Sequence, residues 1–231
     1  MRNLCIIPAR GGSKRIPRKN IRDFLGKPII AYSIEVALNS GLFEEVMVST
    51  DDKEIAEIAQ KYGAKVPFFR SEENANDFAT TADVIKEVIA DYTKTDKEFD
   101  NFCCCYPTAP FISSSRLHEG LKQLQSPSVS SVFPVSEFGY PILRSLKMED
   151  DGRVSMNWPD QLNARSQDLP KAYHDAGQWY WMKTTDFLST GKIIGEHSFG
   201  LQLEAIEVQD IDNEIDWKLA ELKYELLQSL K

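Results

Sequence analysis

The sequence predicts an α/β protein in which a mainly parallel central sheet carries helices on both faces. The first observation is an apolar run of strand length at residues 4–8, followed by a helical pattern over 28–40 and a second strand over 45–52. This is the spacing of a βαβ unit. The second observation is that strand-like and helix-like segments keep alternating to the end of the chain. The third is the length, which fits one domain spanning residues 1–231.

The later elements are predicted from periodicity and from the residues that begin or end helices. An amphipathic pattern over 53–62 ends at Gly63, a residue typical of helix C-termini. The polar, turn-favouring stretch over 71–83 leads into a further helix. The remaining predicted strands are 64–70, 102–106, 130–135, 176–182 and 203–208, and the remaining helices are 84–92, 115–125, 184–189 and 213–230, with a loop over 193–200.

Residues 137–175 interrupt this alternation. They are rich in proline, glycine, aromatic and polar residues, with only short strand signals such as 153–156. A structureless loop of this length is unusual inside a compact domain. The residues alone therefore predict a long insertion.

The composition describes an acidic globular chain with 42% apolar and 27% charged residues and a net charge of −8. Because affinity for nucleic acid depends on neutralising phosphates, this charge argues against a nucleic-acid partner. No apolar stretch approaches the roughly 20 residues that span a bilayer, and no signal-peptide pattern opens the chain. We therefore expect a cytoplasmic protein with no membrane partner. The consecutive residues Cys103, Cys104 and Cys105 are interpreted as small apolar side chains of a buried strand.

The turn after the first strand has the composition of a phosphate-binding site. Five cations follow within ten residues, and the pair Gly11-Gly12 frees the backbone for positive φ. Backbone N–H groups of such a turn can converge on an anion, and Arg10, Lys14 and Lys19 can neutralise a nucleoside triphosphate. The P-loop and dinucleotide-binding patterns are both absent from the sequence. The alternative is a solvated basic loop without a ligand. The five cations are Arg10, Lys14, Arg15, Arg18 and Lys19.

An acidic motif near the C-terminus supplies candidate metal ligands. Alternate residues of an extended segment face the same side, so Asp210 and Asp212 can present two carboxylates to one hard cation. Asp216 lies in the first turn of the following helix, where a structural role and a ligand role are both open. Two aspartates in this spacing are weak evidence for a metal site when they occur alone. The evidence is stronger here because the chain also has a candidate phosphate-binding turn at its other end.

These two motifs resemble those of one enzyme family. The run A-R-G-G-S-K-R-I-P-R-K-N over residues 9–20 resembles the N-terminal signature of the CMP-sialic acid synthetase family, cytidylyltransferases that activate nine-carbon keto-sugar acids. The run D-I-D-N-E-I-D over 210–216 resembles the family's C-terminal motif, whose first two aspartates bind Mg²⁺. The resemblance runs nearly end to end. It implies a Rossmann-like nucleotidyltransferase fold, and a homodimer in which residues 137–175 form an arm that completes the neighbour's sugar site.

The resemblance also implies roles for individual residues. The substrates would be CTP and a nonulosonic acid sugar, with Lys19 at the α-phosphate and Arg10, Ser13 and Lys14 at the β- and γ-phosphates. Lys19, Arg10 and Asp212 would be catalytic. The implied nucleotide-binding residues are Ala9, Arg10, Gly11, Gly12, Ser13, Lys14, Lys19, Asn20, Arg70, Ala79, Thr80 and Thr81. The implied sugar-binding residues are Tyr106, Thr108, Arg165, His174 and Gln178.

The sugar half departs from the sialic acid enzymes. Tyr106 stands where the family usually has glutamine, and residues 111–112 replace a Leu-Arg pair. The run Y-H-D-A-G-Q-W-Y-W over 173–181 resembles the pseudaminic acid branch. For Trp179 and Trp181 two interpretations are equally open: aromatic walls of the sugar pocket, or packing in the core or at a subunit interface. Alternatives are a CMP-sialic or CMP-legionaminic acid synthetase, a metal-dependent glycosyltransferase, and a non-catalytic nucleotide-binding subunit.

Overall fold

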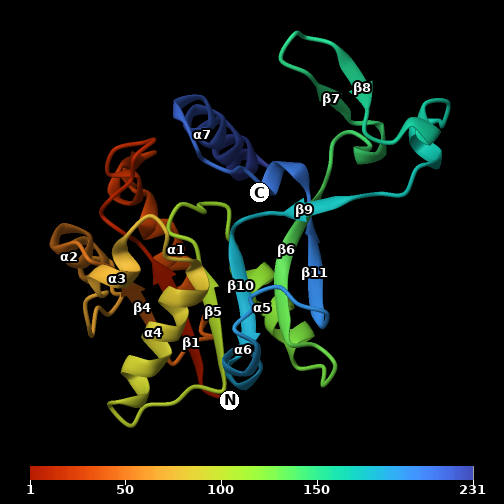
Figure 1. The fold of residues 1–231 in the computed structure, drawn as a ribbon. Helices are drawn as coiled ribbons and strands as arrows, with labels where there is room; N and C mark the ends of the chain where they lie inside the picture. Colours follow the sequence, from red (N-terminus) through yellow and green to blue (C-terminus); the bar gives the residue numbers. More distant parts are fainter. Residues whose placement is uncertain (231) are drawn as a thin grey trace.

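The computed structural model describes residues 1–230 and is organised around a seven-stranded sheet (Figure 1). The strand order is β11-β6-β10-β5-β1-β4, and β9 pairs with the C-terminal part of β6. The strands are β1 Asn3–Pro8, β4 Glu45–Ser49, β5 Asn101–Cys105, β6 Ser131–Glu137, β9 Tyr173–Asp175, β10 Trp179–Lys183 and β11 Ser198–Leu203. β4, β1, β5, β6 and β11 run in one direction, and β9 and β10 run in the other. The predicted mainly parallel α/β sheet is confirmed.

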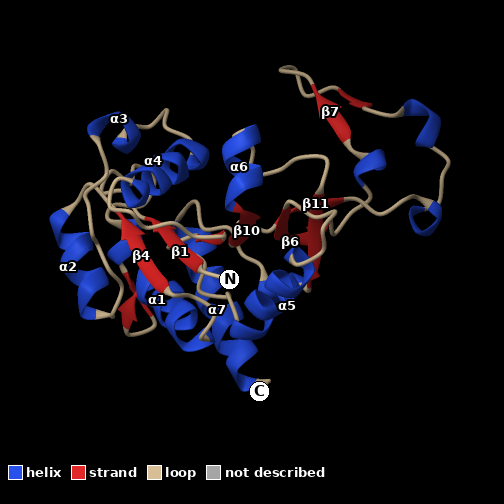
Figure 2. Ribbon diagram, turned by 90° about the horizontal axis from the view of Figure 1, so that it is seen from below, coloured by secondary structure: helices blue, strands red, loops and turns tan. Residues whose placement is uncertain are grey.

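Helices cover both faces of this sheet, because successive residues of the buried strands point to opposite sides (Figure 2). Cys5 and Ile7 face one layer, which contains α1 Ile29–Ser40, α2 Lys53–Lys61 and α5 Ser114–Leu124. Leu4 and Ile6 face the other, which contains α4 Thr81–Thr93 and α6 Thr184–Thr190. The three consecutive cysteines lie fully buried in β5. Their interpretation as small apolar side chains is confirmed.

Three local predictions are wrong. Residues 64–70 form no strand and contribute one isolated bridge, Met47 to Lys65, because this segment has no further neighbour at the sheet edge. The last strand lies at Ser198–Leu203 and not at 203–208, so part of the predicted loop over 193–200 is strand. This strand pairs with β6 on one side only, and only Leu201 and Leu203 of its residues are buried, so the alternation of apolar and polar residues covers just its last part. Residues Ala205–Glu207 instead form a 3-10 turn.

The C-terminal helix α7, Glu214–Ser229, packs on the segment that follows β1. That segment contains a 3-10 turn, Lys19–Ile21, and a small hairpin of β2, Asp23–Phe24, and β3, Lys27–Pro28. Phe24 meets Trp217 edge to face, with 5.7 Å between ring centroids. Ile211, just before α7, is buried in the same cluster. Within residues 1–230, no helix combines the length and apolar character needed to cross a membrane.

The segment between β6 and β9 projects from the body as an arm (Figures 1 and 2). Its base is closed where β9 pairs antiparallel with β6. It contains a hairpin of β7, Leu146–Met148, and β8, Val154–Met156, together with 3-10 turns at Ile142–Arg144, Pro159–Gln161 and Ser166–Asp168. Several large apolar side chains of the arm are exposed: Tyr140, Leu146, Met148, Val154, Trp158 and Leu162.

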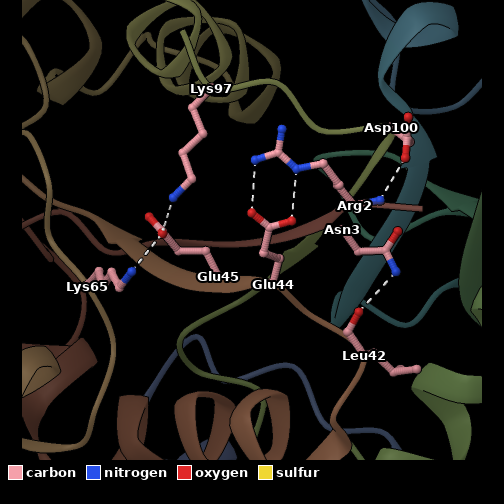
Figure 3. Close-up of polar contacts among 8 residues, drawn as sticks. All are labelled: Arg2, Asn3, Leu42, Glu44, Glu45, Lys65, Lys97 and Asp100. Carbon is pink, nitrogen blue, oxygen red and sulfur yellow. Dashed lines mark hydrogen bonds and ion pairs between the residues drawn. The ribbon is translucent and has the colours of Figure 1, made fainter. Parts of the chain in front are cut away.

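A polar cluster closes the sheet at the end opposite the basic turn (Figure 3). The Glu45 carboxylate, whose side chain is 3% exposed, accepts hydrogen bonds from Lys65 at 2.9 Å, from Lys97 and from the hydroxyl of Tyr92. Beside it, the half-exposed Glu44 carboxylate accepts two hydrogen bonds from Arg2 at 2.9 Å. A short helix, α3 Glu72–Ala75, precedes α4 in the chain.

Candidate functional site

A cavity of about 470 Å³ lies beyond the carboxyl ends of β1 and β5, beside the N-terminus of α4. Ligands of open α/β sheets bind in this position. Eleven of the residues implied by the resemblance line it: Arg10, Ser13, Lys14, Lys19, Asn20, Arg70, Ala79, Thr80, Thr81, Tyr106 and Thr108. The fold therefore brings together residues that are far apart in the sequence.

The first part of the basic turn is held against the end of β4. The backbone N–H of Gly11 donates a 3.0 Å hydrogen bond to Asp51, and that of Ala9 donates a 2.9 Å hydrogen bond to the carbonyl of Ser49. A Cβ at Gly11 would lie 2.7 Å from Oδ2 of Asp52, so a side chain at this position would displace the Asp52 carboxylate. Ala9 is buried, which makes it a packing residue of the turn.

The prediction of positive φ at the glycine pair is wrong. In the described part of the turn the positive φ, 55°, belongs to Arg18, whereas Gly11 and Gly12 have ordinary backbone conformations. Arg18 can take this strained conformation because its guanidinium is held by Asp52 and Glu54 at the start of α2.

The buried side chain of Asn20 closes the turn. Its Nδ2 donates a 2.9 Å hydrogen bond to the backbone carbonyl of Arg10. Asn20 therefore joins the two ends of the loop and positions Arg10 at the cavity. Ser13 and Lys14, between Arg10 and Asn20 in the chain, lie on the cavity wall. A Cβ at Gly12 would meet no atom within 4 Å, so this position faces open space.

Lys19 joins the basic turn to the acidic motif. Its Nζ donates a 2.7 Å hydrogen bond to the carbonyl of Ile211. Burial lowers the pKa of Lys19, and the nearby carboxylates of Asp212 and Asp210 act in the opposite direction without cancelling the effect. The two candidate metal ligands are thus close enough to interact electrostatically with the cation assigned to the α-phosphate.

The acidic motif is held by the residues between and after its aspartates. Ile211 is buried, whereas Asp210 and Asp212 on either side remain accessible, as expected for an extended segment. Oδ2 of Asp216 accepts hydrogen bonds from the backbone N–H groups of Asp212 at 2.9 Å and Asn213 at 3.0 Å. Of the two roles open for Asp216, this geometry corresponds to the structural one.

The donor set suits a divalent cation that also binds phosphate. Within residues 1–230, no group of three or more His, Cys, Asp or Glu side chains could hold a metal ion. Mg²⁺ commonly uses one or two carboxylates together with substrate phosphates and water. Asp210 and Asp212 match that requirement, although Arg15 pairs with Asp212 at 2.6 Å and would have to yield to the metal.

The opposite wall of the cavity is formed by Arg70, by the segment over 74–79 and by the start of α4. Arg70 is buried and donates to the backbone carbonyl of Ser49 at 2.6 Å and to its hydroxyl at 3.1 Å. Burial lowers the pKa of Arg70, with Asp51 acting in the opposite direction. Thr80 caps α4 through a capping box with Asp83, and Thr80, Thr81 and Val84 of this helix start line the cavity.

One aromatic residue, Tyr106, lines the cavity beside Pro107 and Thr108. Tyr106 lies over Tyr180, with 5.3 Å between ring centroids, and its hydroxyl is 3.2 Å from Oγ1 of Thr81. The Tyr180 hydroxyl donates to Asp175 at 2.7 Å. Trp179 and Trp181 are fully buried, so of the two interpretations left open for them the structure supports packing.

The other implied sugar residues lie outside the cavity lining. Gln178 is buried and its Nε2 donates a 2.6 Å hydrogen bond to the carbonyl of Glu207. His174 is exposed on β9 and packs edge to face on Phe138. Arg165 lies on the arm and pairs with Asp168 at 2.7 Å. Within one chain, the structure does not bring these three residues to the cavity.

Sequence reasoning missed Asp77, which lines the cavity and pairs with two of its cations. It also missed Asn74 in α3 and Asn76 in the loop that follows, whereas Arg15, already counted among the cations of the basic turn, lines the cavity as well. The available signal was position, because Asp77 lies just before the residues 79–81 that the resemblance implied. The ion pairs of Asp77 with the basic turn are tertiary contacts, and no pattern in the neighbouring sequence predicts them.

The fold and the site define a nucleotidyltransferase, with a basic turn after the first strand and an acidic pair that meets it from the other end of the chain. A solved structure described as CMP:2-keto-3-deoxy-manno-octonic acid synthetase complexed with CTP has the same fold, with a TM-score of 0.68 and 18% identity, covering 99% of this chain and 100% of that one. The cytidylyltransferase family profile matches residues 4–206. The chain belongs to the cytidylyltransferase family and is a CTP-dependent nucleotidyltransferase.

Two relatives match over nearly their whole length. A pseudaminic acid cytidylyltransferase of Campylobacter jejuni is 44% identical over 226 residues, which cover 98% of this chain and 97% of the relative. A CMP-N,N'-diacetyllegionaminic acid synthase of Legionella pneumophila is 36% identical, over 99% of this chain and 98% of the relative. The family match confirms the resemblance noted in the sequence.

Proposed function

We propose that this enzyme transfers CMP from CTP to the anomeric hydroxyl of pseudaminic acid, with release of pyrophosphate. The observation that carries the sugar assignment is the 44% identity to a pseudaminic acid cytidylyltransferase over 98% of the chain. The aromatic ring of Tyr106 on the cavity wall supports it, because pseudaminic acid ends in a methyl group where sialic acid has a hydroxylated tail.

The triphosphate lies along the basic turn in this proposal. Arg10, Ser13 and Lys14 hold the β- and γ-phosphates, and Lys19 neutralises charge at the α-phosphate as the sugar hydroxyl attacks in line. The cytosine ring lies against Arg70 and the N-terminus of α4. Reaction requires the α-phosphorus bond to the pyrophosphate oxygen to break as the bond to the sugar oxygen forms.

Asp210 and Asp212 hold Mg²⁺ or Mn²⁺ when nucleotide is bound. A divalent cation at this position supplies charge neutralisation on the phosphates and lowers the pKa of a hydroxyl that it binds. The residues of this chain contribute the support: Ile211 is anchored in the core, Asp216 holds the backbone of Asp212, and Lys19 ties the motif to the turn.

A homodimer and a cytoplasmic location belong to the same proposal. The arm exposes apolar side chains such as Met148 and Leu162, which a second copy would cover. An arm donated by the partner would also bring Arg165 to a sugar carboxylate that it does not reach within its own chain. CTP is a cytoplasmic substrate, and all four cysteines are free thiols.

Pyrophosphate release tests the proposal, measured with CTP, Mg²⁺ and a panel of keto-sugar acids. We expect kcat/KM for pseudaminic acid to exceed that for N-acetylneuraminic acid by at least about tenfold, the discrimination that an apolar pocket provides for small groups. Legionaminic acid should fall between them. Equal or reversed preference would discard the sugar assignment and leave cytidylyl transfer intact.

A further inference from the structure

One carboxylate in the cavity faces the cations assigned to the leaving group. Oδ1 of Asp77 pairs with Nη1 of Arg10 at 3.0 Å, and Oδ2 pairs with Nζ of Lys14. The same Nη1 of Arg10 donates a 3.1 Å hydrogen bond to the backbone carbonyl of Asn76. The loop over 76–77 therefore occupies both side chains that would hold the β- and γ-phosphates.

A rigid turn presents this carboxylate. Oδ1 of Asn76 accepts hydrogen bonds from the backbone N–H groups of Phe78 at 2.7 Å and Ala79 at 3.1 Å. Nδ2 of Asn76 donates a 2.6 Å hydrogen bond to the carbonyl of Glu73. Hydrogen bonding to Lys14 holds the pKa of Asp77 below its usual value, so the group is an anion at neutral pH.

Carboxylate and phosphate oxygens compete for the same N–H groups of arginine and lysine. We propose that Asp77 is an intramolecular competitor of pyrophosphate: it holds Arg10 and Lys14 when no phosphate is bound, yields to CTP, and speeds the release of pyrophosphate after transfer. This inference rests on the placement of the triphosphate along the basic turn.

The solvent exposure of these ion pairs determines how strongly Asp77 can lower the affinity for pyrophosphate. The side chains of Arg10, Lys14 and Asp77 are 37%, 76% and 39% exposed. Exposed ion pairs are weak, and losing two of them corresponds to a change in affinity of roughly three- to tenfold. A competitor of this strength does not close the site to CTP, but it lowers the affinity for the product.

Calorimetric titration of inorganic pyrophosphate into the full chain tests the inference. Asp77→Asn removes the charge and keeps the size, and we expect it to bind pyrophosphate roughly three- to tenfold more tightly than the unaltered chain. Asp77→Glu should behave like the unaltered chain. Glu73→Gln is the matched control, because it removes an exposed carboxylate from the same segment outside the cavity lining. Asp77→Ser provides a second neutral variant should Asp77→Asn fold poorly.

A double-mutant cycle locates the competition. The increase in pyrophosphate affinity caused by Asp77→Asn should be smaller in a Lys14→Ala background, because one of the two cations for which Asp77 and pyrophosphate compete is then absent. Equal or weaker binding by both neutral variants, beside normal binding by the unaltered chain, would overturn the role of Asp77 and keep the triphosphate placement. Pyrophosphate binding that is absent, or unaffected by Lys14→Ala, would overturn both.

Discussion

Nζ of Lys19 donates a 2.7 Å hydrogen bond to the backbone carbonyl of Ile211, 192 residues further along the chain. Two ion pairs reinforce this connection, from Arg15 to Asp212 at 2.6 Å and from Arg22 to Glu214 at 2.6 Å. The basic turn and the acidic motif are therefore one structural unit. A change in either segment is expected to affect the other.

Lys19→Ala should lower kcat by about a hundredfold or more and weaken CTP binding much less, because the ammonium stabilises charge that develops in the transition state. Single-turnover kinetics and CTP titration measure the two effects. Arg22→Ala is the matched control, since it removes another connection between the same segments without lining the cavity. A comparable loss of kcat in the control would mean that Lys19 acts by holding the segments together.

Asp210→Asn and Asp212→Asn should each lower turnover by at least about a hundredfold, because metal-assisted charge stabilisation is worth several kcal/mol. The melting temperature should change little, since both side chains are accessible. Titration with Mn²⁺ in the presence of a non-hydrolysable CTP analogue gives a reading independent of activity. Unchanged Mn²⁺ affinity in either variant would contradict the ligand assignment for that residue.

Glu45→Gln should reduce the free energy of unfolding by about 2 kcal/mol at neutral pH, the scale of hydrogen bonds to a charged group. Burial alone would raise the pKa of Glu45, but hydrogen bonds from Lys65, Lys97 and Tyr92 outweigh it, so the pKa lies below its usual value. The stabilisation is therefore present above the unfolded-state pKa of about 4.3 and is lost as the pH falls through the folded-state value.

Denaturant unfolding between neutral and acidic pH measures this dependence. Glu45→Gln should show a shallower loss of stability on acidification than the unaltered chain. Glu44→Gln on the same strand end is the control, and it should change stability little because its pair with Arg2 is exposed (Figure 3). Equal effects of the two variants would show that burial of Glu45 adds nothing.

Mixing two inactive variants tests whether the arm acts on a neighbouring subunit. Arg165→Ala and Lys19→Ala chains should each be nearly inactive. When they are co-expressed and pair at random, half of the dimers are mixed and each has one intact site, so about a quarter of normal activity should return. Co-expression of Lys19→Ala with Asp212→Asn is the control for two residues that belong to the same chain. Activity should return in this control only if Lys19 and Asp212 of one site come from different chains.

The fold class was accessible to sequence reasoning because buried strands and amphipathic helices carry their own periodicity. The wrongly predicted elements lie at the edges of the sheet. Residues 64–70 and 198–203 show only weak alternation of apolar and polar residues, and whether they form strands depends on which neighbouring strand is available. Reversal of β10 between β5 and β6 was equally hidden, because strand direction depends on the connections around it.

The sequence by itself determined the chemistry at the two ends of the chain. Clustered cations and alternating carboxylates are local properties, so the basic turn at 10–19 and the pair Asp210 and Asp212 are visible without a fold. Only the tertiary structure decided which groups meet: Lys19 with the carbonyl of Ile211, and Asp77 with Arg10. The physical reason is that these contacts join segments remote in sequence: burial of Ile211 in the cluster around Phe24 and Trp217 brings it to Lys19, and the fold places the loop of Asp77 beside the basic turn.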